Sequence, residues 1–148
     1  MADLDRVREL ATGDHNLAVV SIARPDGSVQ TSVVTAGVIV DPVDSSIGVG
    51  FVANGGSAKL RLLRRNGQAT VTFKSGFRWT SVGGPVRLIG PDDPDPEGLG
   101  VPDLIRTVHR SAGGDHEDWA EFDRVMADDR RCAVFIKAEK ISSNPGSG

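Results

Sequence analysis

The chain has little of what several protein classes require. Among its 148 residues there is one cysteine and no tyrosine, and no apolar run approaches the roughly 18 residues that cross a membrane. Cys132 therefore cannot form an intramolecular disulfide, and its apolar surroundings, Cys-Ala-Val-Phe-Ile, indicate a small core residue of a protein in a reducing compartment. The first residues mix acids and bases without the apolar segment of an export signal. We expect a cytoplasmic protein with no membrane partner.

The chain has no excess of basic residues. The net charge is −3 and the isoelectric point is near 5.5, so we expect no nucleic-acid partner, because neutralising phosphates requires a clustered basic surface. Local charge is segregated, since acid gathers at 92–97 and 115–129 whereas one basic cluster contains Lys59, Arg61, Arg64 and Arg65. This pattern favours a positive site for a small polyanion on an acidic protein.

Several catalytic signatures are also missing. The chain has no Gly-x-Ser-x-Gly elbow, and its glycines at 48, 50, 55 and 56 do not form the dinucleotide fingerprint Gly-x-Gly-x-x-Gly. His109 and His116 lie near acidic residues, but their spacing does not converge on a metal ion. The residues therefore indicate neither a hydrolase nor a Rossmann enzyme, and we expect no metal site.

Short strands dominate the hydrophobic pattern. Alternating and β-branched residues predict six strands, over 17–23, 28–40 with a bend at Gly37, 47–53, 68–74, 77–89 with an interruption at 83–85, and 133–141. Helical spacing predicts an entry helix that Gly13 ends, a basic helix over 57–65 closed by Asn66-Gly67, and two later helices around 104–108 and 119–126. The proline-rich acidic residues 90–102 predict an exposed connection.

The order of these elements predicts the fold class. Several antiparallel strands with few helices favour a mainly β, α+β domain built as a small barrel over a parallel βαβ fold. The length predicts one domain, which we place at 1–141. Residues 142–148 are expected to form a flexible C-terminal tail.

The segment Phe51 to Lys59 carries the chemistry. Ala53 and Asn54 end a strand, Gly55 and Gly56 let the backbone approach a ligand, and the helix that follows opens with Ser57, Ala58 and Lys59. Unpaired amides at a helix N-terminus, a hydroxyl and an ammonium together favour a bound phosphate. The alternative, which local sequence alone leaves open, is that Ser57 only caps the helix and Lys59 is only solvated.

A family resemblance rests on this segment and on motifs in the same order along nearly the whole chain: Asp26-Gly27, Gln30-Thr-Ser32, Asp41-Pro42, Ser57-Ala-Lys-x-Arg-x-Leu-Arg-Arg65, Trp79, His116-x-Asp-Trp119 and Asp129-Arg-Arg131. The chain resembles the pyridoxamine 5′-phosphate oxidase-like split β-barrels. More narrowly, it is similar to the actinobacterial flavin/deazaflavin oxidoreductases of the B type, many of which use the deazaflavin F420.

The resemblance implies a six- to seven-stranded antiparallel split barrel that forms a homodimer, with a cofactor groove at the dimer interface. It implies that Ser57, Lys59 and the amide of Ala58 contact the cofactor phosphate. It also implies that Gln30 and Ser32 face the ring system and that Trp79 lines the groove. The arginines of the helix, Arg61, Arg64 and Arg65, would spread positive charge along the anionic tail of F420.

The resemblance implies an F420-binding oxidoreductase that passes a hydride from the reduced deazaflavin to an electron-poor small molecule. The absence of an obvious acid or base is compatible with this, because in such chemistry the protein chiefly orients the cofactor. Two alternatives stay open. One is that the chain is a carrier that binds F420 or a flavin without turnover. The other is that it is an FMN-dependent oxidoreductase. Ala58 makes the FMN hypothesis weaker, since flavin-using oxidases of this type commonly have a second basic residue at that position.

Overall fold

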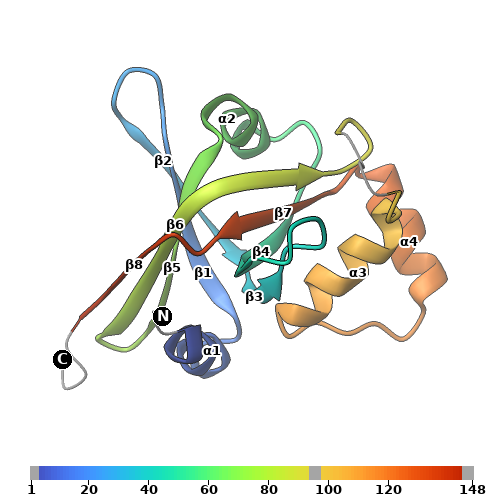
Figure 1. Ribbon diagram of the computed structural model, residues 1–148. Coiled ribbons are helices and arrows are strands. Elements are labelled where there is room, and N and C mark those ends of the chain that lie inside the picture. The colour runs from blue at the N-terminus through green and yellow to red at the C-terminus, as the bar shows by residue number, and fades with distance from the viewer. Residues whose placement is uncertain (1–3, 94–97, 145–148) are drawn as a thin grey trace.

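One antiparallel sheet organises the chain. The computed structural model describes residues 4–93 and 98–144, and within them the strand order is β2-β1-β5-β6-β7-β4-β3, with β8 paired to β6 (Figure 1). The predicted mainly β, α+β class is confirmed. The strands are β1 (Leu17–Ala23), β2 (Val29–Thr35), β3 (Gly37–Val40), β4 (Ile47–Ala53), β5 (Gln68–Ser75), β6 (Arg78–Ile89), β7 (Cys132–Lys137) and β8 (Lys140–Ser143).

The described strands number eight because two predicted strands are each divided. The predicted strand 28–40 breaks before Gly37, where a Cβ atom would lie 1.8 Å from the Ser111 carbonyl oxygen. The predicted final strand becomes β7 and β8, which pair with different partners. The prediction of a flexible tail from residue 142 was wrong for its first residues, since β8 includes Ser142 and Ser143; residues 145–148 lie outside the described residues.

Asn144 fixes the end of β8. Its side-chain amide donates to the Phe77 carbonyl at 2.8 Å, and its Oδ1 accepts from the Trp79 amide at 3.0 Å and from Arg6 Nη2 at 2.6 Å. These bonds join the end of β8 to the β5–β6 turn and to the first helix.

β6 bends the sheet into a barrel. Its first half pairs with β5 and β8, whereas its second half pairs with β7. The change of partner occurs beside Gly84, where a Cβ atom would lie 2.0 Å from the Lys137 carbonyl oxygen. Gly48 of β4 makes a similar approach, 1.9 Å from the Ile136 carbonyl oxygen. Only glycine permits both strands to approach β7 this closely.

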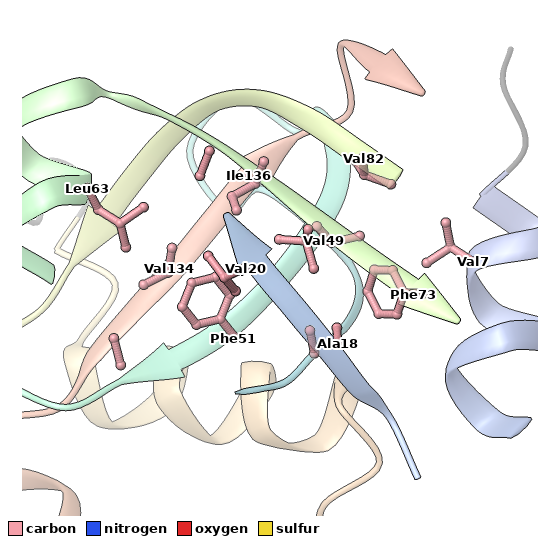
Figure 2. Close-up of a cluster of buried hydrophobic side chains, with 14 of the residues drawn as sticks. Val7, Ala18, Val20, Val49, Phe51, Leu63, Phe73, Val82, Val134 and Ile136 are labelled. Carbon is pink, nitrogen blue, oxygen red and sulfur yellow. The ribbon is translucent and has the colours of Figure 1, made fainter. Parts of the chain in front are cut away.

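The barrel encloses the larger of two hydrophobic clusters (Figure 2). Alternate residues of β1, β4, β5 and β7 point into it, and the largest fully buried side chains include Phe51 and Phe73. Two helices add leucines and valines to the same cluster: α1 (Leu4–Gly13) and α2 (Ala58–Asn66). Apolar burial of this kind, about 25 cal/mol per Å², is the main stabilising term of such a domain.

The two remaining helices lie between β6 and β7 in the chain. They are α3 (Val101–Ser111) and α4 (Trp119–Asp128), and they cover β4 and β7 through a second cluster that contains Ile105, Phe122 and Phe135. Both were predicted, although α3 begins within the segment expected to be an exposed connection. None of the helices in the described ranges is long and apolar enough to span a membrane.

Replacing Gly84 by alanine tests the bend. We expect Gly84→Ala to lower the free energy of unfolding by roughly 2–4 kcal/mol, because the added methyl group overlaps the backbone of β7. Gly27→Ala is the matched control: Gly27 has φ +88° and no atom within 4 Å of its Cβ position, so only backbone strain of about 1 kcal/mol is expected. Urea unfolding measures both. Equal losses of unfolding free energy in the two variants would contradict the conclusion that Gly84 allows β6 to bend.

Candidate functional site

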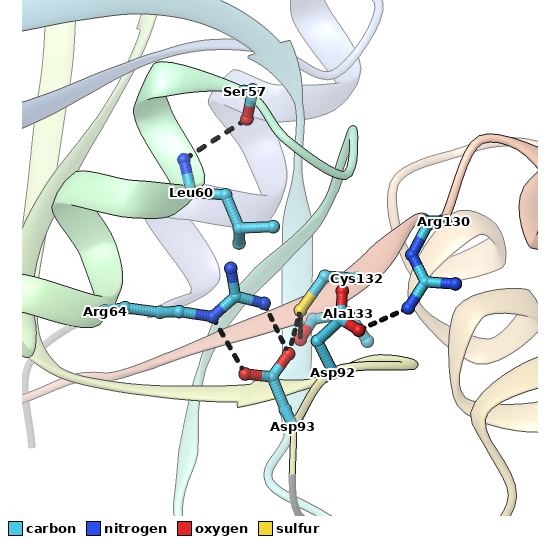
Figure 3. Close-up of polar contacts among 8 residues, drawn as sticks. All are labelled: Ser57, Leu60, Arg64, Asp92, Asp93, Arg130, Cys132 and Ala133. Carbon is cyan, nitrogen blue, oxygen red and sulfur yellow. Dashed lines mark hydrogen bonds and ion pairs between the residues drawn. The ribbon is translucent and has the colours of Figure 1, made fainter.

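The glycine loop, residues 54–57, connects β4 to α2. Ser57 caps the helix, since its Oγ accepts from the Leu60 amide at 3.2 Å (Figure 3). At the other end Gly67 adopts φ 66°, and its amide donates to the Leu63 carbonyl at 2.9 Å. Both predicted helix ends are confirmed. A hydroxyl that accepts one bond still has its own proton to donate, so capping leaves Ser57 able to contact an anion.

The glycines have separate tasks. The Gly55 amide donates to the Asp129 carbonyl at 3.2 Å, and a Cβ atom at position 55 would lie 2.4 Å from the Arg130 carbonyl oxygen. Gly55 therefore packs the loop against the turn that follows α4. Gly56 has φ +78° and an open side. The Ala58 and Lys59 amides of the first helical turn have no acceptor within 4–93 and 98–144, and such amides attract an anion.

Lys59 is a half-buried cation without an acidic partner among the described residues. Its ammonium lies 5.8 Å from the centroid of the Phe51 ring. Burial lowers the pKa of Lys59 below its ordinary value, and the nearby positive charge of Arg131 lowers the pKa further. Because the two positive charges act on one another here, an anion close to both would be stabilised by both.

Arg131 is the member of this group that sequence reasoning missed. It follows the turn after α4, more than seventy positions from Lys59, and its contacts with Asp129 Oδ2 are long, 3.4 Å from both Nε and Nη2. The motif Asp129-Arg-Arg131 was the available signal. Nothing in the sequence showed that β7 brings this turn beside the glycine loop.

The three arginines of α2 differ in their surroundings. Arg64 is held by Asp93 through two bonds, Nε–Oδ1 at 3.0 Å and Nη2–Oδ2 at 2.9 Å (Figure 3). The expected contact of Arg64 with a cofactor tail therefore does not fit this geometry. Arg61 donates to the Gly56 carbonyl at 2.7 Å. Arg65 is exposed and has no ion pair in the described ranges.

Asp93 also contacts Cys132. The thiol is buried and donates to Asp93 Oδ2 at 3.4 Å. Burial and the Asp93 charge raise the pKa of Cys132 to about 12, while the hydrogen bond from Arg64 holds the pKa of Asp93 below its ordinary value. A thiol with so high a pKa is a poor nucleophile at neutral pH, which agrees with the predicted core role.

Gln30 and Ser32 lie on the inward face of β2, opposite Ile22 and Val20 of β1. Gln30 Oε1 and Ser32 Oγ are buried, and neither has a hydrogen-bond partner in the part of the chain that the structure describes. An unsatisfied buried polar atom costs about 1–3 kcal/mol. Two of them on one strand face favour a polar ligand or water at this place.

Trp79 lies far from the glycine loop. It is the second residue of β6 and is 38% exposed. The other end of β6 pairs with β7 at Ala133, next to the residue that pairs with Ala53. A strand of that length spans roughly 30 Å before its bend is counted. One chain therefore does not bring Trp79 to Lys59.

Two of the three histidines pack against aromatic residues of the second cluster. His109 and His116 pack around the rings of Trp119 and Phe122, with centroid distances of 4.8–6.2 Å. Within the described residues, no group of three or more His, Cys, Asp or Glu side chains is arranged to hold a metal ion.

Comparison with known proteins places the fold. No protein-family model and no curated protein matches the chain. Among solved structures it is similar to a conserved hypothetical protein of Mycobacterium tuberculosis, at 18% identity and a TM-score of 0.66 over 97% of this chain and 84% of that one. It is also similar to a pyridoxamine 5′-phosphate oxidase-related, FMN-binding protein of Nostoc punctiforme, at 11% identity and 0.65 over 100% and 86%.

A third similar structure is an F420 reductase, at 16% identity and a TM-score of 0.56 over 85% of this chain and 88% of that one. Identities this low carry the fold alone. The chain therefore has the pyridoxamine 5′-phosphate oxidase-like split-barrel fold.

The Cys132 thiol predicts a loss of stability in alkali. Its pKa is about 12 in the folded chain and about 8.5 when unfolded, so the stability that it contributes is complete below about pH 8.5 and is lost as pH rises toward 12. Urea unfolding should show a decline of up to about 1.4 kcal/mol per pH unit above pH 9 that Cys132→Ala lacks. No tyrosine titrates in this range. Parallel pH profiles for the two proteins would contradict the prediction.

Proposed function

We propose that the chain is an F420-binding oxidoreductase whose cofactor phosphate binds at the N-terminus of α2. One observation carries the proposal: the half-buried Lys59 ammonium lies beside open helix amides and Arg131, with no acid to neutralise it among the described residues. A hydroxyl, two amides and two cations match the donors that a phosphate accepts from. Ser57, Ala58, Lys59 and Arg131 would hold it.

The inward face of β2 supports a larger ligand than free phosphate. Gln30 Oε1 accepts and Ser32 Oγ both donates and accepts, and both are buried without partners within the described ranges. Polar groups of a ring system or its linker would satisfy them. Bound F420 supplies hydride transfer, and the chain's own residues would orient the ring and exclude water.

The free cations favour F420 over FMN. Because Arg64 is paired with Asp93, the exposed arginines of α2 that remain available to an anion are Arg61 and Arg65. The single phosphate of FMN does not require these two additional charges, whereas a multiply anionic tail would be stabilised by both. The solved split barrels include both an F420 reductase and an FMN-binding protein, so binding must be measured with both cofactors.

A second copy of the chain would complete the groove. Exposed apolar side chains lie on the outer face of β2, β1 and β6, namely Leu17 (39%), Val29 (53%), Val33 (64%) and Trp79 (38%). The helices α1 and α2 both pack on the opposite, core side of this sheet. We infer that the uncovered face joins two copies, which would let Trp79 of one copy reach the glycine loop of the other.

Lys59→Ala tests the phosphate site. A fluorescence titration with F420, FMN and FAD should give the tightest binding for F420, and the variant should bind F420 about 10–100-fold more weakly, since a charged hydrogen bond contributes about 1.5–3 kcal/mol. Lys137→Ala, which removes an exposed strand lysine outside the inferred interface, is the control and should bind as the unaltered chain does. An unchanged affinity in Lys59→Ala would place the phosphate elsewhere. Saturable binding of reduced F420 with no oxidation by quinones or enones would show a carrier.

Mixing two variants tests whether the groove is shared. Lys59→Ala and Trp79→Ala should each bind F420 weakly. A mixture re-formed from unfolded chains should recover tight binding at about one quarter of the sites, because half of the dimers are mixed and each has one intact site. Lack of recovery, with both variants folded, would show that Trp79 acts within its own chain or plays no part.

A further inference from the structure

A cavity lies outside the proposed cofactor groove. It has a volume of about 290 Å³ and lies between α3, α4 and the turn after α4. Its apolar wall includes Val101 and Ile105 of α3 with Met126 and Ala127 of α4, and Arg130 and Arg131 lie at its edge. This volume is near the lower limit of small-molecule sites, which are typically apolar with a few placed polar groups.

The charged groups of this cavity are unequally neutralised. Asp123 is paired with Arg106, whose Nε donates to Oδ1 at 2.8 Å. Arg130 pairs with Asp92 (Figure 3). Arg131 is the least satisfied, because its two contacts with Asp129 are both 3.4 Å long, and its positive charge acts on Lys59, where it lowers the pKa. The edge of the cavity therefore offers one available cation beside an apolar wall.

We propose that this cavity binds a small molecule with an apolar body and one anionic group, such as a medium-chain carboxylate, whose carboxylate contacts Arg131. The apolar body would lie against Ile105 and Met126 and bury apolar surface of the cavity wall. The apolar wall of the cavity comes from α3 and α4, so binding here can be measured on the cofactor-free protein.

The position of the turn gives the cavity a link to the cofactor site. The segment Asp129–Arg131 forms one edge of the cavity, and its backbone packs against Gly55 of the glycine loop. A carboxylate on Arg131 would neutralise one of the two positive charges that act on one another at Lys59. Occupation of the cavity would therefore weaken, rather than strengthen, phosphate binding at α2.

Met126 gives a direct readout. The chain has two methionines, Met1 and Met126, so labelling the methionine methyl groups with carbon-13 yields two signals, one of them from the cavity wall. We expect octanoate to shift the Met126 signal saturably in the full-length, cofactor-free protein. Octanamide, which has the same body without the charge, should bind at least several-fold more weakly. Absence of a saturable shift with octanoate would overturn the proposal.

Variants separate the two parts of the site. Arg131→Gln should abolish the preference for octanoate over octanamide while the Met126 signal still responds to both. Arg124→Gln removes an exposed arginine of α4 that does not line the cavity and should keep the preference. Ala127→Leu should fill the cavity and remove both responses. An intact preference in Arg131→Gln, or undiminished binding in Ala127→Leu, would overturn the proposal, and neither result depends on F420 binding.

Discussion

The close approach of two strands to β7 is the constraint on which the structure depends. Carbonyl oxygens of Ile136 and Lys137 occupy the space where side chains at positions 48 and 84 would begin. Because these positions are glycines, β6 can leave β5 for β7, and the sheet curves into a barrel. The same curvature sets the start of β7 beside the end of β4, so the turn after α4 reaches the glycine loop. A backbone contact thus positions the site's charges.

Acidic residues then divide the basic ones into two groups. Asp93 holds Arg64 and Asp92 holds Arg130, so these arginines serve the structure. Lys59 receives no such partner from the described chain, and its lowered pKa reflects burial beside another cation. An acidic protein therefore keeps a local excess of positive charge at α2. An anion bound close to both would recover the free energy that is lost by confining like charges.

The parts of the site that could be predicted from sequence are local in the chain. Ser57 and Gly67 bound α2 through contacts of a few residues, and the strand and helix periods gave the fold class. Contacts between distant residues could not be predicted. The pairing of Arg64 with Asp93 spans 29 positions, and β8 extends the sheet only because β6 presents a free edge there. Periodicity carries no signal for either, and the same holds for the nearness of Arg131 to Lys59.

The central claim is that the N-terminus of α2 holds the phosphate of an F420-type cofactor. A crystal structure of the protein with F420 bound tests it most directly. The account predicts phosphate oxygens within hydrogen-bond distance of Ser57 Oγ, the Ala58 amide and Lys59 Nζ, with the ring beside Gln30 and Ser32. A phosphate bound away from α2, or a complex in which Lys59 faces only solvent, would contradict it.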